Sequence, residues 1–201
     1  FSDRYAHAPE LFGGLDVWDD PAMREQQGQW PVLFLTFAGI KQTTFDETRR
    51  SINQLLADLY NQYSWLKKDK LLSDADRAFF DKVDETMSSN VAAIAIHKLC
   101  EWLSRYYGKN VLIFLDEYDT PLQEAYLNGY WDELVQYIRL LFNNTFKTNP
   151  SLYRAVMTGI TRVSKESIFS DLNNLNVVTT TKNKYATAFG FTEEEVFAAL
   201  D

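Results

Sequence analysis

Val111-Leu112-Ile113-Phe114-Leu115-Asp116-Glu117 is the most informative run in this chain of 201 residues. Its five consecutive apolar residues predict a strand that is buried on both faces, as the strands of a parallel sheet are. Two carboxylates follow at the carboxyl end of that strand, which is where open α/β sheets bind their ligands. The run therefore predicts an α/β fold and marks one edge of its sheet as the place to look for chemistry.

Two more segments have the composition of strands in such a sheet. Pro31–Phe37 is mostly apolar, and Tyr153–Thr158 is stopped by Gly159. Apolar residues at helical spacing predict helices between the strands, and strands that alternate with helices are typical of a parallel sheet. Residues 1–30 are expected to form loops with one helical turn at most. The helices are expected over about 44–66, within 67–85, over about 90–107 and 131–146, and from residue 193 on.

Composition limits the classes of protein that the chain can belong to. The net charge of −8 argues against a protein that wraps nucleic acid by neutralising phosphates alone. No apolar run reaches the length that spans a membrane, and no secretory signal is present. Cys100 is the single cysteine, so an internal disulfide is excluded and a reducing compartment fits. These features predict a cytoplasmic protein without a membrane partner.

Asp116 and Glu117 fit the pattern of the acidic strand in nucleotide hydrolases. There an Asp holds Mg²⁺ through water and the following Glu polarises the attacking water. In the alternative interpretation, these acids cap a helix that begins near Pro121, or they face solvent. Asp119 adds a third carboxylate, and three close acids repel one another unless a cation or a positive side chain offsets them. The third acid therefore favours a site linked to a metal ion.

Hydroxyl and cationic side chains follow the third strand. Thr158, Arg162 and Lys165 would face the same crevice as the acids and could contact a phosphate. In the alternative, the segment is a polar turn in which Ser164 caps a helix. The segment is also close to a phosphate-binding loop in pattern, but Ser164 stands where that loop needs a glycine, and Glu166 would repel a triphosphate.

Short runs spread over nearly the whole chain carry a family resemblance. In order, they are Glu10–Leu15, Trp30–Val32 with the strand that follows, Leu115–Leu122, Thr158–Gly159 with Arg162, Ser164 and Lys165, Ser167–Ser170, Leu172–Leu175 and Gly190–Val196. Their order and spacing resemble the bacterial AAA-ATPase-like proteins, which often carry a PD-(D/E)XK nuclease-like domain at the C-terminus.

The resemblance implies a P-loop NTPase core that binds ATP and Mg²⁺. Asp116 would be its magnesium carboxylate and Glu117 its water-activating carboxylate. By position, Thr158 resembles the residue that senses the γ-phosphate, while Arg162 and Lys165 fall within a family signature that assigns them no role.

The resemblance also implies that residues 1–201 are a partial domain. The phosphate-binding loop and its strand would precede the Glu10 segment, and the nuclease-like domain would follow Asp201. We therefore expect the chain alone to bind ATP weakly or not at all. Nucleic acid would be a partner only through the further domain, and the sequence identifies no protein partner.

Two other functions remain open from the sequence. The acidic surface and the 15% aromatic content would permit a non-catalytic protein-interaction module with a degenerate nucleotide site. A metal-dependent nuclease could use Asp116, Glu117 and a lysine such as Lys165. Against the nuclease, no Glu-x-Lys spacing follows the acidic strand.

Overall fold

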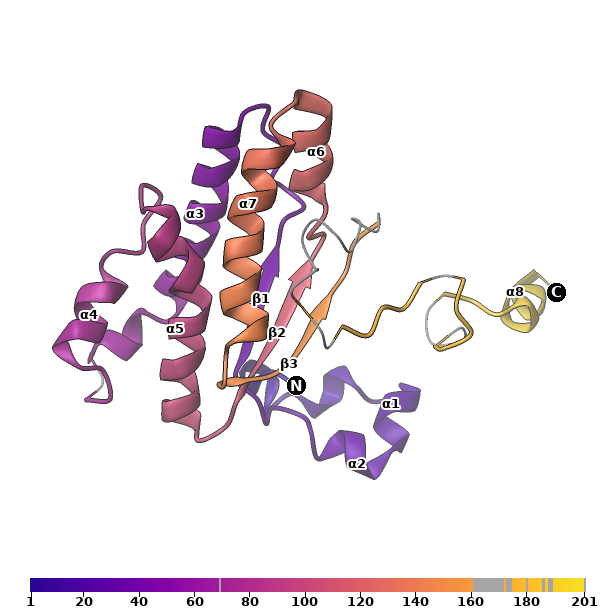
Figure 1. Ribbon diagram of the computed structural model, residues 1–201. Coiled ribbons are helices and arrows are strands. Elements are labelled where there is room, and N and C mark those ends of the chain that lie inside the picture. Colours follow the sequence, from indigo (N-terminus) through magenta and orange to yellow (C-terminus); the bar gives the residue numbers. More distant parts are fainter. Residues whose placement is uncertain are drawn as a thin grey trace. The chain divides into compact units, whose positions relative to one another are not determined.

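The computed structural model describes residues 1–68, 70–160, 172, 175–179, 181–185, 187 and 190–200 (Figure 1). The chain divides into two compact units, Phe1–Asp171 and Leu172–Asp201. The first unit contains a parallel sheet of three strands in the order β1-β2-β3. This confirms the predicted α/β class. The strands are β1 (Val32–Thr36), β2 (Val111–Asp116) and β3 (Leu152–Met157).

Helices connect the strands, so each step from one strand to the next is a crossover, as parallel pairing requires. In Figure 1, α3, α5 and α7 lie together along one face of the sheet. The second unit contains α8 (Glu193–Leu200). Among the described residues, the first unit contains α1 (Asp16–Asp19), α2 (Pro21–Arg24), α3 (Phe45–Gln62), α4 (Asp74–Phe80), α5 (Ser89–Tyr107), α6 (Thr120–Asn128), α7 (Trp131–Phe142) and a π-helical turn (Asn143–Lys147).

The sheet has one covered face and one open face. Side chains alternate between faces along a strand, and the face toward the helices buries Leu33 and Ile113, which are 0% and 1% exposed. The opposite face carries Phe34, Phe114 and Val156, which are paired across the three strands. Phe34 is 60% and Val156 51% exposed. Parallel sheets are ordinarily covered on both faces. The row of Phe34, Phe114 and Val156 is therefore a part of the sheet that the described residues leave uncovered.

Most predicted elements are present, with differences at their ends. The long helix is capped by Thr44, whose hydroxyl accepts the N–H of Glu47 at 3.4 Å, as the capping box predicts. The next helix begins at Ser89, one residue before the predicted start at about residue 90, because the Ser88 hydroxyl accepts the N–H of Val91. It ends at Gly108, whose φ of 64° is the left-handed cap conformation.

Two features were not foreseen, and a third was expected only in the alternative interpretation of the acids. The first 30 residues contain α1, α2 and two 3-10 turns rather than a single helical turn. The predicted helix over 131–146 is α-helical only to Phe142 and then widens into the π-helical turn. α6 begins at Thr120, next to Pro121, where that alternative placed the start of a helix.

Cys100 and the apolar helices can be followed in the structure. Cys100 is fully buried, and burial raises the pKa of its thiol to about 12, as expected of an inert core residue. Among the residues that the structure describes, no helix is both long and apolar enough to cross a bilayer.

Candidate functional site

Asp116 is the last residue of the central strand, and Glu117 follows it at the carboxyl edge of the sheet. Both side chains are partly exposed there. Because β2 has a neighbour on each side, residues from β1 and β3 flank Asp116. Thr36 is its partner in the register of β1, and Thr158 directly follows the end of β3. The acids are therefore presented at the edge where α/β sheets bind ligands.

Hydroxyl groups hold both oxygens of the Asp116 carboxylate. The Thr158 hydroxyl donates to Oδ1, and the Thr36 hydroxyl donates to Oδ2 at 3.4 Å. The Thr158 oxygen also accepts the N–H of Glu117 at 3.4 Å. The three strand ends thus form one hydrogen-bonded row, Thr36–Asp116–Thr158, with the carboxylate in the middle.

Glu117 has an unusual backbone conformation. Its φ of 50° is in the left-handed region, which residues other than glycine adopt infrequently. The turn brings its carboxylate to the first residue of α6, where the Thr120 hydroxyl donates to Oε2 at 3.0 Å. The Thr120 N–H also donates to the Glu117 carbonyl at 3.1 Å. A side chain on a left-handed turn at a functional edge is one way in which proteins aim a catalytic group.

Asp119 does not join the other two acids. It is 0% exposed, and Gln123 donates to its Oδ2 at 2.9 Å. Gly159 approaches it so closely that an added Cβ would lie 2.6 Å from its Oδ1. The N–H of Tyr118 donates to the Thr158 carbonyl at 3.1 Å, which ties the same loop to the end of β3. Asp119 therefore belongs to the packing that supports the acids rather than to a cluster of three carboxylates.

The charges of Asp116 and Glu117 are not offset by ion pairs within the described part of the chain. The six salt bridges found there involve other acids. The described residues also contain no group of three His, Cys, Asp or Glu side chains that could hold a metal ion by themselves. A single carboxylate held by hydroxyls suits Mg²⁺, which keeps several waters and takes one or two protein carboxylates beside substrate phosphates.

The structure brings together three of the five predicted site residues, Asp116, Glu117 and Thr158. Arg162 and Lys165 lie outside the described residues. Sequence reasoning missed Thr36 and Thr120. Thr36 ends a strand that was predicted, so its place at the same edge was available in principle, but the pattern of one strand says nothing about its register with another.

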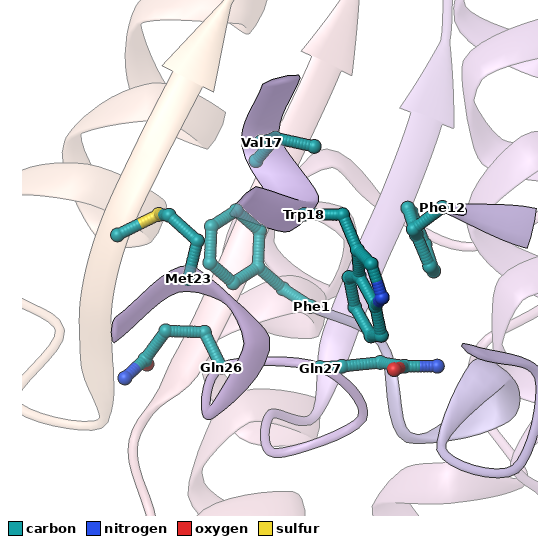
Figure 2. A pocket seen from close by; sticks show the side chains of 7 residues that line it. All are labelled: Phe1, Phe12, Val17, Trp18, Met23, Gln26 and Gln27. Atoms are coloured by element: carbon teal, nitrogen blue, oxygen red, sulfur yellow. The ribbon is translucent and has the colours of Figure 1, made fainter. Parts of the chain in front are cut away.

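A separate apolar pocket lies near the opposite edge of the sheet. It is formed by the first segment of the chain, which pairs with Trp30 just before β1. The Trp18 ring stacks on Phe12 at 5.5 Å between centroids. Figure 2 shows the amides of Gln26 and Gln27 turned to opposite sides, so they do not converge on a ligand. The pocket is lined by Phe1, Phe12, Val17, Trp18, Met23, Gln26 and Gln27.

Comparison with known proteins finds a family and a relative that this chain resembles. The family described as predicted AAA-ATPase (AAA-ATPase-like) matches residues 1–169. A protein of Azotobacter chroococcum mcd 1, named uncharacterized protein in vnfD 5'region, is 30% identical over 97 residues. These residues are 46% of this chain and 18% of that protein, so the match spans less than a fifth of the relative's length. No solved structure matches the chain significantly.

Proposed function

Since the chain belongs to the family of predicted AAA-ATPases, we propose that it is part of a domain that binds and hydrolyses ATP at the carboxyl edge of its sheet. The observation that carries this proposal is the position of Asp116, at the end of the central strand with a hydroxyl group on each carboxylate oxygen. Its charge is not offset by any ion pair among the described side chains. A carboxylate in this setting is suited to a divalent cation that accompanies a nucleotide.

In this proposal Asp116 would hold Mg²⁺ through the water shell of the ion. An ionised carboxylate has about four lone-pair positions, and the two threonine hydroxyls use two of them. The remaining positions are available at the strand end. When bound, the ion would offset charge on the β- and γ-phosphates of ATP.

Glu117 is proposed to polarise the water that attacks the γ-phosphate. Its carboxylate is partly exposed and one residue beyond Asp116, so both groups serve the same edge. The hydrogen bond from Thr120 holds one oxygen, Oε2, at 3.0 Å. Oε1 remains to accept a hydrogen from water, which is the act that orients a nucleophile. A glutamine in its place would keep the shape of the side chain and lose most of its ability to take a proton.

Thr158, Arg162 and Lys165 are proposed to face the nucleotide from the end of β3 and the segment after it. Thr158 is exposed beside Asp116, which supports this place for it. The two cations follow it by four and seven residues in the sequence, a reach compatible with phosphate contacts.

We further propose that residues 1–201 form part of a larger P-loop domain, in which the strand of the phosphate-binding loop pairs with β3. Among the described strands, β3 pairs on one side only, with β2. Tyr153 and Val156 on it are 49% and 51% exposed. An apolar strand with an open edge is a place where another strand adds.

The test uses the full-length protein with Asp116→Asn and Glu117→Gln. Glu117→Gln should lower the turnover of ATP by 100-fold or more and leave ATP binding unchanged. Asp116→Asn should weaken the Mg²⁺-dependent part of ATP binding as well. Glu124→Gln, at a partly exposed position of α6, is the control and should keep full activity. Unchanged hydrolysis in both site variants would refute the proposed roles and favour the alternative, a non-catalytic interaction module.

A further inference from the structure

We propose that Thr36 is a positioning residue that sets the orientation of the Asp116 carboxylate for a hydrated divalent cation. The inference rests on the proposed function and extends it to a residue of the neighbouring strand. It follows from three observations at the ends of β1, β2 and β3: the backbone register, the direction of one hydrogen bond and the symmetry of the contacts on the carboxylate.

The backbone fixes the two residues relative to each other. Thr36 and Asp116 are register partners in the parallel pair β1–β2. The N–H of Phe37 donates to the Asp116 carbonyl at 2.9 Å, so this pairing continues past the last residue of β1. Partners in a sheet present their side chains to the same face. The Thr36 hydroxyl therefore meets the Asp116 carboxylate because of the fold rather than by a chance rotamer.

The direction of the hydrogen bond follows from the donors available. The Thr36 oxygen accepts the N–H of Ala38 at 3.3 Å. A hydroxyl has a single hydrogen, and an ionised carboxylate can only accept. The hydrogen of Thr36 therefore goes to Asp116 Oδ2, at an oxygen–oxygen distance of 3.4 Å. The β-branch of threonine restricts its χ1 rotation, which keeps this hydroxyl pointed at the carboxylate.

The contact from Thr36 is matched on the other side by Thr158. The Thr158 hydroxyl donates to Oδ1 and so holds the second oxygen. With one hydroxyl on each oxygen, rotation of the carboxylate about its Cβ–Cγ bond breaks at least one hydrogen bond. Loss of the Thr36 hydroxyl alone leaves the carboxylate tethered at a single oxygen and free to turn. The water shell of a cation would then meet a less ordered acceptor.

The experiment measures Mg²⁺ binding rather than turnover alone. The full-length protein, with a non-hydrolysable ATP analogue bound, is titrated with Mg²⁺ by calorimetry. The variants are Thr36→Val, which keeps the shape and β-branch, Thr36→Ala, which removes the hydroxyl without adding bulk, and Thr36→Ser, which keeps the hydroxyl. Thr43→Val, at an exposed position after the same strand, is the control. Binding of the analogue in EDTA reports on folding and on nucleotide contacts that need no metal.

We expect Thr36→Val and Thr36→Ala to weaken Mg²⁺ binding on the order of tenfold. This change in the binding constant corresponds to the lower end of what a hydrogen bond to a charged group contributes. Thr43→Val should behave as the unaltered protein, and Thr36→Ser should keep most of the Mg²⁺ affinity, because it retains the hydroxyl and lacks only the β-branch. Analogue binding in EDTA should not change in any variant. Wild-type Mg²⁺ affinity in Thr36→Val, or an equal loss in Thr36→Ser, would overturn the inference. Asp116→Asn distinguishes a failure of the Thr36 inference from a failure of the proposed function. If Asp116→Asn also leaves the Mg²⁺ affinity unchanged, the proposed function itself is wrong.

Discussion

Gly159 offers the sharpest test of how the site is supported. It follows Thr158 at the end of β3, where the loop after β2 approaches most closely. A Cβ at this position would lie 2.6 Å from Asp119 Oδ1 and 2.9 Å from Tyr118 Cε1. Asp119 is fully buried, and Gln123 donates to its other oxygen. Its carboxylate would have to move by about 0.8 Å to reach 3.4 Å, the short end of ordinary contact.

Gly159→Ala should therefore destabilise the protein by about 2 kcal/mol, the middle of the range for overpacking in a rigid setting. For a unit of 171 residues this corresponds to a fall in Tm of about 6 °C. The same shift should lower ATP turnover, because Tyr118 and Glu117 are both tied to Thr158. Thermal unfolding followed by circular dichroism measures the first effect and steady-state hydrolysis the second.

Gly39→Ala is the matched control for this variant. Gly39 follows β1 near the same edge, and nothing lies within 4 Å of its added Cβ. Its Tm should stay within about 1 °C of the unaltered protein. If Gly159→Ala and Gly39→Ala unfold at the same temperature, the loops are not packed as described, and Asp119 has no part in holding the acids.

Two further predictions concern the stability of the fold. Asn53→Ala should lower the free energy of unfolding by about 3 kcal/mol, because it leaves the carbonyls of Glu85 and Met87 without their amide donor. The control is Gln54→Ala at an exposed position, which should lower it by less than about 0.5 kcal/mol. Urea unfolding measures both variants, and equal midpoints for the two would contradict the prediction. Burial, with the negative charge of Asp3, raises the pKa of Tyr63 to about 12. The unfolded chain loses this proton near pH 10, so stability falls as pH rises from 10 to 12. Urea titrations at pH 8 and pH 11 give the loss in unfolding free energy between the two pH values. This loss should be smaller in Tyr63→Phe than in the unaltered protein, and an equal loss would refute the role of Tyr63.

The order of strands and helices could be predicted because it follows from local patterns. An apolar run such as Val111–Leu115 must be buried, and the capping box of Thr192 and Glu195 forms within one turn, with the Thr192 N–H donating to Glu195 at 2.7 Å. The polar part of the core could not be predicted in this way. Asn53 and Tyr60 are 0% and 1% exposed, since their side chains bond to groups more than 30 residues away.

The site was predicted in part for a related reason. Asp116 and Glu117 stand in one run, so a single strand was enough to mark them. Thr36 is 80 residues before Asp116, and it becomes a neighbour only through the register of β1 with β2. Thr120 was within the run Leu115–Leu122 that carries the family resemblance. Its contact depends on the left-handed turn at Glu117, and a glutamate gives no sign of that conformation.

The alternative in which these acids cap the next helix can be weighed against the structure. The residue before α6 is Asp119, and its side chain makes no capping hydrogen bond. Asp116 is a strand residue whose carboxylate is held by hydroxyls. Helix capping therefore explains the position of neither Asp119 nor Asp116. Glu117 does lie at the start of α6, where a negative charge is favourable. However, the Glu117 carboxylate accepts a hydrogen bond from the Thr120 hydroxyl rather than from a free backbone N–H. Asparagine or glycine would also adopt the φ of 50° more readily than glutamate does. A conformation that costs free energy and gains little as a cap supports the proposal that Glu117 carries a functional carboxylate.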